Sequence, residues 1–269
     1  MLGAIIGDIV GSRFEFNNIK TKDFELINKQ STFTDDTVLT IAVMDWLVNA
    51  KERNDKTAAE YLQKWARKYP YAGYGGMFSR WKDLANPKPY NSCGNGSAMR
   101  ISGVGWAAKD MAEVKYLSDT VTEVTHNHPE GMKGALVTAQ LMFMARTGSS
   151  KEELKAFAEQ YYNLNFSYDD LVANYKHEEE ICQNTVPQAI YCFLISENME
   201  DAIRNCVAIG GDCDTTGAMC GAIAEAYYQS CKLSDFEDKF LYFLIDPKVE
   251  QLIKEMHNRI DSKKFAGDK

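Results

Sequence analysis

The chain has 269 residues, of which 45% are hydrophobic and 25% are charged, and its formal net charge at pH 7 is −8. A chain of this length and composition can bury a large core, and its negative charge argues against a broad basic surface for nucleic acid or anionic membrane. No apolar run approaches the ~20 residues of a membrane-spanning helix, and the seven cysteines form no CxxC pair, which favours buried free thiols in a reducing, cytoplasmic setting over a zinc ribbon.

The first segment, GAIIGDIVGSRFEF, is apolar and carries a glycine at every fourth position. Gly3, Gly7 and Gly11 would share one face of a helix and let another helix approach closely. We do not interpret this segment as a signal peptide, because it lacks a basic leader and contains Asp8. Glu15 follows the glycine face and either lines a pocket or is solvated.

Three longer segments show helical patterns. Residues 36–50 are apolar on nearly every face, which predicts a helix buried at the centre of a domain. Residues 57–68 are amphipathic, and residues 130–146 mix Ala, Leu, Met and Val at helical spacing.

Helix starts are also marked in the polar stretches. Ser150, Ser167 and Ser234 each begin a sequence typical of a capping box. Period-two alternation is nowhere sustained, so strand signals are weak. The sequence therefore predicts an all-α fold with ten or more helices, in which residues 1–269 form a single compact domain with a frayed tail from Ser262. We expect a monomer, because no feature demands an interface.

The first of two acidic clusters, Thr34-Asp35-Asp36-Thr37, lies at the start of the apolar segment 36–50. Thr and Asp at a helix start are commonly caps, because they accept backbone N–H bonds and complement the helix dipole. Taken alone, this cluster is better explained as a cap than as a site.

The second cluster, Asp212-Cys213-Asp214-Thr215, stands at the start of another predicted helix. Gly210 and Gly211 before it can end one helix and turn the chain sharply. The helix that follows, residues 216–228, is rich in Gly and Ala, and we expect these small residues to pack against the helix of residues 36–50. If the two helices are parallel, both acidic clusters meet at one end.

Four carboxylates in one place would repel one another and raise each other's pKa values. Hard divalent cations relieve this repulsion, and carboxylate and hydroxyl oxygens suit Mg²⁺, Mn²⁺ or Ca²⁺ better than zinc. Two cations about 3.5–4 Å apart, bridged by a shared carboxylate, form a known catalytic arrangement. The two clusters together therefore favour a two-metal site over two separate caps.

Two glycine-rich loops and a pair of histidines are further candidates. Residues 71–77 and 92–100 expose backbone N–H groups that could bind phosphate, although most such loops are simply turns and neither matches a nucleotide-binding fingerprint. A helix would put His126 and His128 on different faces, which argues against shared metal ligation. We interpret His126 as a polar contact to a ligand.

These motifs resemble the ADP-ribosylglycohydrolase family, which includes dinitrogenase reductase-activating glycohydrolase and the ADP-ribosylarginine and ADP-ribosylserine hydrolases. The resemblance runs from Gly3 to about Tyr228 and rests on GAIIGDIVGSRFE, FTDDT, GYGG, GNGSAMR, THNHP, TVPQAIYCF and GGDCDTTGAMCGAIAEAYY, in the family's order. It implies an all-α fold with two Mg²⁺ (or Mn²⁺) ions, Asp214 bridging them, and the ligands Thr34, Asp35, Asp36, Asp212, Asp214 and Thr215. It also implies substrate contacts from Gly75, Gly76, Ser92, Gly94, Asn95 and His126.

The activity that the resemblance implies is hydrolysis of the glycosidic bond between ADP-ribose and a modified group, on a protein side chain such as arginine or serine or on a small molecule. The catalytic carboxylates would be Asp35, Asp36 or Glu15, which would assist proton transfer. A two-metal phosphoesterase and an ADP-ribose-binding module without turnover are the alternatives. The sequence leaves the linkage open, because the possible substrates differ only in the leaving group.

Overall fold

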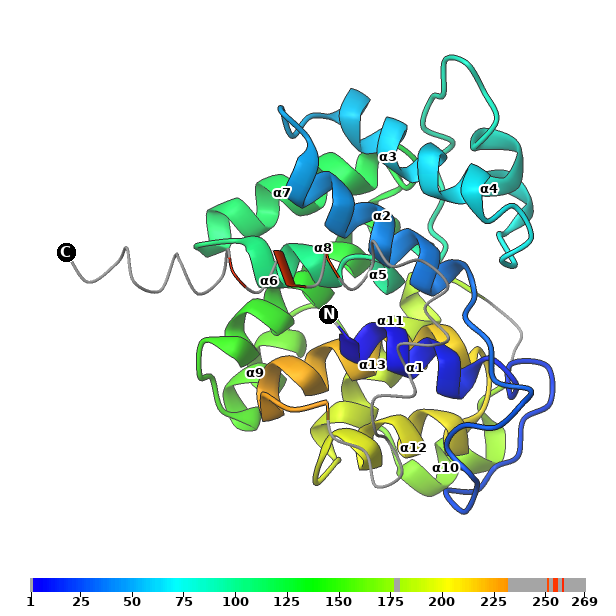
Figure 1. The fold of residues 1–269 in the computed structure, drawn as a ribbon. Helices are drawn as coiled ribbons and strands as arrows, with labels where there is room; N and C mark the ends of the chain where they lie inside the picture. The colour runs from blue at the N-terminus through cyan, green and yellow to red at the C-terminus, as the bar shows by residue number, and fades with distance from the viewer. Residues whose placement is uncertain (1, 177–179, 232–250, 252–253, 256–257, 259–269) are drawn as a thin grey trace.

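The computed structural model describes residues 2–176 and 180–231, together with residues 251, 254, 255 and 258 (Figure 1). In the two long stretches the chain forms helices joined by loops, and the β-structure described there is one isolated bridge between Gly94 and Ile181. The all-α fold class is therefore confirmed. The helices are α1 (Leu2–Gly11), α2 (Asp35–Asn49), α3 (Asp55–Lys68), α4 (Gly76–Trp81), α5 (Gly96–Met99), α6 (Ser102–Ala107), α7 (Met111–Glu123), α8 (Pro129–Arg146), α9 (Lys151–Ala158), α10 (Tyr168–Asn174), α11 (Cys182–Leu194), α12 (Met199–Ile209) and α13 (Cys213–Tyr228).

Most predicted helix starts are found in the structure. Ser150 forms the predicted capping box at α9, with both reciprocal bonds present. Ser167 caps α10 by accepting a hydrogen bond from the backbone N–H of Asp170. The predicted capping box at Ser234 and the predicted frayed tail from Ser262 lie outside the described residues.

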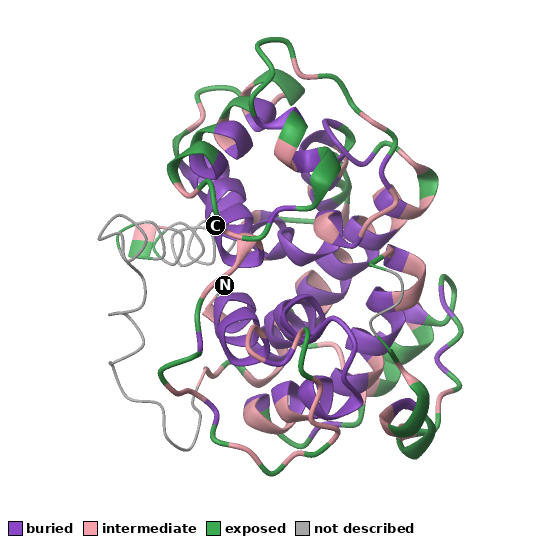
Figure 2. Ribbon diagram, turned by 90° about the vertical axis from the view of Figure 1, so that its right-hand side faces the viewer, coloured by how far each residue is buried: buried purple, intermediate pink, exposed green. Residues whose placement is uncertain are grey.

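Helix α13 is the central helix of the fold. Fourteen of its sixteen residues are buried, and it packs against α1, α8, α11 and α12. In Figure 1, α1 and α13 lie side by side in the middle of the molecule, with α2 and α3 above them and α12 below. Figure 2 shows the buried residues concentrated in these middle helices.

The glycine face of α1 packs directly on α13. A Cβ atom at Gly3 would lie 2.2 Å from the carbonyl oxygen of Gly221, and one at Gly7 would lie 1.9 Å from that of Gly217. A Cβ atom at Gly11 would lie 2.3 Å from the carbonyl oxygen of Cys213. Since later residues of α1 meet earlier residues of α13, the two helices are antiparallel, and the C-terminal end of α1 lies at the N-terminal end of α13.

This packing corrects the predicted partner of α13. The small residues of α13 contact α1, whereas α2 makes only minor contact with α13. The physical reason is that α1 has glycines at the same four-residue spacing as Gly217 and Gly221, which lets the two backbones touch. α2, in contrast, carries large apolar side chains on nearly every face and packs mainly against α3.

The state of the cysteines and the presence of membrane-spanning helices can also be compared with the sequence analysis. All seven cysteines are free thiols, and five of them are buried, as predicted. Among the described residues, no helix is both long enough and apolar enough to cross a bilayer.

Candidate metal centre

A cavity of about 650 Å³ opens where the first turns of α2 and α13 meet the two glycine-rich loops. Every residue to which the sequence assigns a site role lines this cavity, although the residues come from six separate segments: Glu15, Thr34, Asp35, Asp36, Gly75, Gly76, Ser92, Gly94, Asn95, His126, Asp212, Asp214 and Thr215. The structure thus brings the whole predicted set together. The role of each residue stays a prediction.

The first acidic cluster forms the start of α2. The side chain of Thr34 accepts a hydrogen bond from the backbone N–H of Asp36 at 3.3 Å, so it is an N-cap as well as a candidate ligand. Asp35 and Asp36 occupy the first turn, where the helix dipole favours negative charge. The cap and the site are therefore built from the same residues, and the two interpretations do not exclude each other.

The second acidic cluster follows a turn that glycine makes possible. Gly210 and Gly211 have φ values of 75° and 72°, in the left-handed region that other residues seldom adopt. Asn18 fixes this turn with two hydrogen bonds to Gly211: its amide donates to the carbonyl oxygen at 3.0 Å and its oxygen accepts from the backbone N–H at 2.8 Å. The loop after α1 therefore holds Asp212 at the start of α13.

The two helix starts touch each other through a hydrogen bond. The hydroxyl of Thr215 donates to Oδ2 of Asp36 at 3.1 Å. This contact joins the two clusters into one site, as the sequence predicts, although α1 rather than direct α2–α13 packing brings them together.

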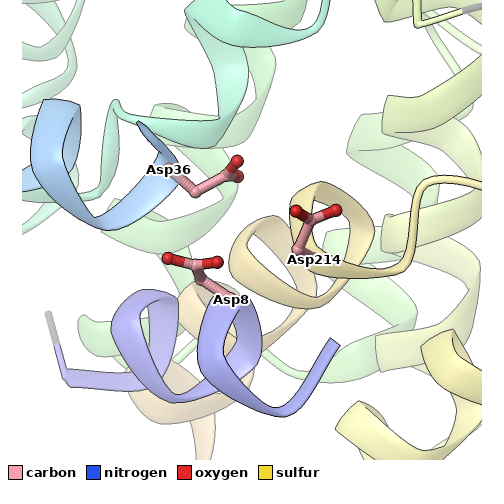
Figure 3. A group of neighbouring side chains, drawn as sticks. All are labelled: Asp8, Asp36 and Asp214. Atoms are coloured by element: carbon pink, nitrogen blue, oxygen red, sulfur yellow. The ribbon is translucent and has the colours of Figure 1, made fainter. Parts of the chain in front are cut away.

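Carboxylate oxygens converge at this junction in two groups. Asp8, Asp36 and Asp214 offer oxygens within 4.8 Å of one another, and Glu15, Asp212 and Asp214 do the same. Figure 3 shows the first group, with its carboxylates directed toward one another from α1, α2 and α13. Because Asp214 belongs to both groups, two neighbouring cation positions could share it.

Asp8 is a site residue that the sequence analysis did not identify. Its Oδ2 accepts from the backbone N–H groups of Thr34 and Thr37 at 2.9 and 3.0 Å and from the Thr37 hydroxyl, and its Oδ1 accepts from the Thr34 hydroxyl at 2.8 Å. These four donors use the roughly four lone-pair sites of a carboxylate. Asp8 therefore holds Thr34 in place. The feature of the sequence that could have identified Asp8 is that it is a single charged residue in an otherwise apolar helix.

Burial and mutual repulsion raise the pKa values of these acids. Burial, together with the charges of Asp8 and Asp212, raises the pKa of Asp35 to about 8. Burial and the neighbouring carboxylates hold the pKa values of Asp36 and Asp214 well above their usual range. A cation at this junction would stabilise the charged forms and oppose these shifts.

The residues present fit hard divalent cations. Oδ1 of Asp36 is buried and has no hydrogen-bond partner among the described residues, which is expected where an ion completes the site. The donor atoms at the junction are carboxylate and hydroxyl oxygens, the set that suits Mg²⁺ or Mn²⁺. The thiol of Cys213, which lies between two of the acids in the sequence, is fully buried and is not part of the cavity lining.

The loop of residues 92–100 forms another wall of the cavity. The side-chain amide of Asn95 donates to Oδ2 of Asp212 at 2.6 Å and to the hydroxyl of Thr185 at 3.2 Å. Asn95 thus positions an acid of the second cluster. The hydroxyl of Ser92 accepts from the backbone N–H of Gly94 at 3.1 Å, and both residues line the cavity.

The loop of residues 71–77 borders the open side of the same cavity. Gly73 has a φ of 99°, so a side chain there would be strained. A Cβ atom at Gly75 or Gly76 would meet nothing within 4 Å. The space over these two glycines is therefore free of protein, which is compatible with their predicted role in substrate binding.

His126 is buried at the cavity wall, with its Nδ1 2.7 Å from the hydroxyl of Thr125. Burial, and to a lesser extent the charge of Arg100, lower the pKa of His126 well below its usual range, so the ring is neutral near pH 7. Arg100 itself was not predicted as a site residue. Its guanidinium is fully buried and donates to the same Thr125 hydroxyl at 2.7 Å.

Comparison with known proteins identifies the family. The model of the ADP-ribosylglycohydrolase family matches residues 1–237. The chain is 27% identical over 306 residues to human "ADP-ribosylhydrolase ARH3", covering 85% of this chain and 84% of that protein. It is 24% identical over 262 residues to "ADP-ribosylarginine hydrolase Tri1" of Pseudomonas putida (strain GB-1), covering 85% of this chain and 69% of that protein.

A solved structure shares the fold. The structure titled "ADP-ribosylglycohydrolase-related protein complex" aligns with a TM-score of 0.72 at 23% sequence identity, covering 96% of this chain and 95% of that one. The family match covers most of the chain and agrees with the predicted resemblance. This chain belongs to the ADP-ribosylglycohydrolase family.

Proposed function

We propose that this protein is a metal-dependent hydrolase that releases ADP-ribose from a modified group by cleaving the bond at the anomeric carbon of the distal ribose. The observation that carries the proposal is the pair of carboxylate groups that share Asp214 at the wall of a cavity of about 650 Å³. A cavity of this size is in the usual range for small-molecule sites. The family match and the names of the two relatives point to ADP-ribose as the occupant.

The proposed cations are Mg²⁺ or Mn²⁺, held by Thr34, Asp35, Asp36, Asp212, Asp214 and Thr215. When bound, such ions would supply Lewis acidity and would orient hydroxyl groups of the ribose. Asp8 and Asn95 each form a hydrogen bond with a proposed ligand. Asp8 accepts a hydrogen bond from the Thr34 hydroxyl, and the side-chain amide of Asn95 donates one to Asp212. Partners of this kind fix the orientation of ligating residues.

A carboxylate that lines the cavity carries out the proton transfer. A water molecule bonds to the anomeric carbon while the bond to the oxygen or nitrogen of the leaving group breaks and its electron pair goes to that atom. A carboxylate takes the proton that the water loses, and the leaving group gains a proton from the carboxyl so formed or from solvent. Among Asp35, Asp36 and Glu15, we favour Asp35, because its Oδ1 lies toward Gly73, at the loop that borders the cavity, so that this oxygen can take a proton while the other holds a cation.

The leaving group is the protein side chain or the small molecule to which ADP-ribose is attached. The two relatives differ in name, and one of them specifies arginine. The acids, the glycine loops and His126 would all contact the ADP-ribose part, which every such substrate shares. Residues at the edge of the cavity therefore determine which linkage is hydrolysed.

The test is release of ADP-ribose from defined arginine-, serine- and acetyl-linked substrates, with Mg²⁺, with Mn²⁺ and with EDTA. We expect turnover of at least one substrate with metal and its loss in EDTA. We also expect Asp214→Asn to lower kcat by about 10²-fold or more, since the shared carboxylate stabilises both cation positions. The matched control is Asp45→Asn, a buried acid of α2 outside the cavity.

The alternatives give different results in the same assay. AMP or free phosphate as the product would favour a two-metal phosphoesterase. Tight binding of ADP-ribose without turnover of any linkage would favour a binding module. Full activity in EDTA would contradict the role of the metal.

A further inference from the structure

At the wall of the cavity, Arg100, Thr125 and His126 form a chain of hydrogen bonds in which Thr125 lies between two residues that line the cavity. Arg100 is fully buried, although it is among the residues that line the cavity. Its Nη2 donates to the Thr125 hydroxyl at 2.7 Å, and the same hydroxyl lies 2.7 Å from Nδ1 of His126. Only His126 at the end of this chain is among the residues predicted to contact a ligand.

The direction of the Thr125–His126 hydrogen bond follows from what surrounds the hydroxyl. A guanidinium can only donate, so the Thr125 oxygen is an acceptor toward Arg100. The hydroxyl has one hydrogen left to donate, and its candidate acceptors are Nδ1 of His126 at 2.7 Å, the carbonyl oxygen of Thr122 at 3.4 Å and the hydroxyl of Tyr90. The Tyr90 hydroxyl can instead donate to the second acceptor position of the Thr125 oxygen. That carbonyl already accepts from the backbone N–H groups of Thr125 at 3.1 Å and of His126 at 2.9 Å. We assign the hydrogen of the hydroxyl to its short contact with Nδ1 of His126 at 2.7 Å.

A neutral imidazole has one N–H group. If its Nδ1 accepts a hydrogen bond from Thr125, the hydrogen must be on Nε2. Nε2 lies beside the glycine-rich loop, where a Cβ atom built on Gly96 or Gly94 would be 3.5 or 3.7 Å away. The glycines thus leave room for a ligand atom next to this nitrogen.

We propose that Arg100 and Thr125 fix His126 as the Nε2–H tautomer, so that its ring presents a hydrogen-bond donor to an oxygen atom of the ligand. Arg100 and Thr125 are positioning residues that act through His126. The charge of Arg100 polarises the Thr125 hydroxyl and makes it a stronger donor. The opposite tautomer would present a bare nitrogen, which would repel a phosphate or ribose oxygen. The choice of ADP-ribose as the ligand rests on the proposed function, whereas the tautomer does not.

The first test reads the tautomer directly. Long-range ¹H–¹⁵N NMR spectra of protein with ¹⁵N-labelled histidine separate protonated from unprotonated ring nitrogens, and a His126→Gln spectrum assigns the His126 signals among the four histidines. We expect a protonated Nε2 and an unprotonated Nδ1 at pH 7 in the metal-free protein. A protonated Nδ1 would overturn the proposal.

The second test removes the hydroxyl without changing the size of the side chain. Thr125→Val should abolish the single fixed tautomer and weaken ADP-ribose binding about tenfold, the effect of losing about 1.4 kcal/mol from one hydrogen bond. Thr125→Ser keeps the hydroxyl and should restore both properties. Thr122→Val is the matched control, because the Thr122 hydroxyl is also buried but has no hydrogen-bond partner in the described chain.

The two readouts separate this proposal from the proposed function. A folded Thr125→Val protein that keeps the wild-type tautomer and the wild-type affinity would overturn the positioning role. If the wild-type protein shows the Nε2–H tautomer and Thr125→Val loses it, the positioning role stands even where no linkage is hydrolysed. In that case the proposed function alone fails.

Discussion

At the scale of single residues, the site depends on groups that hold the candidate ligands as much as on the ligands. Asp8 accepts four hydrogen bonds from Thr34 and Thr37. By accepting the hydrogen of the Thr34 hydroxyl, it leaves one lone pair of that oxygen free to face a cation, while the other accepts from the backbone N–H of Asp36. A carboxylate with all its lone pairs in use is better suited to this orienting role than to ligation.

We therefore expect Asp8→Asn to weaken Mn²⁺ binding at least tenfold in isothermal titration calorimetry. Asparagine has one acceptor oxygen where Asp8 has two, and its NH₂ group would face donors, so Thr34 would lose its fixed orientation. The control is Asp45→Asn, which also breaks buried hydrogen bonds, to Lys64, Trp65 and Asn49, but away from the cavity. Equal loss of Mn²⁺ affinity in both variants would contradict a specific role for Asp8.

At the scale of helices, the sequence predicts which segments are helical better than which helices touch. The predicted helix of residues 36–50 is α2 (Asp35–Asn49), because a long, mainly apolar segment can be recognised from its local sequence alone. The partner of α13 could not be inferred from α13 alone, since a face of small residues accepts any helix with a matching surface. For the same reason Asp8 was missed: its hydrogen-bond donors lie 26 and 29 residues away in the chain.

The contact between α1 and α13 leads to a prediction about stability. Gly7→Ala should lower the free energy of unfolding by about 3 kcal/mol, because its Cβ would lie 1.9 Å from the carbonyl oxygen of Gly217 and the two backbones would have to separate. Gly76→Ala is the control, since a Cβ there meets nothing within 4 Å. Urea denaturation of the three proteins measures the difference, and equal midpoints for wild type and Gly7→Ala would be inconsistent with this packing.

At the scale of the whole molecule, acids from α1, α2 and α13 are buried together in a protein that already carries a net charge of −8. The fold places them where their charged forms are costly, and it does so at the junction of its central helices. Such an arrangement stabilises the protein only if protons or cations neutralise the acids. Folding, proton binding and metal binding are therefore expected to be linked.

The sign of this linkage can be derived for the metal-free protein. Burial and neighbouring charges raise the pKa of Asp35 to about 8, and burial raises that of Asp8 to about 6, both from 3.8. Between pH 4 and pH 8 the folded state then binds more protons than the unfolded state, so stability falls as the pH rises through this range. We expect the melting temperature in EDTA to drop by about 5 °C from pH 6 to pH 8.

A divalent cation should reverse this loss, because it neutralises the carboxylates that release their protons. We expect the rise in melting temperature on adding Mn²⁺ to be larger at pH 8 than at pH 6, since binding to the folded state adds stability and protons compete less at the higher pH. In Asp35→Asn, which lacks one of the titrating carboxylates, both the pH dependence in EDTA and the effect of Mn²⁺ should be smaller. A larger effect of Mn²⁺ at pH 6, or a melting temperature that does not change with pH in EDTA, would show that the buried acids do not couple folding to metal binding.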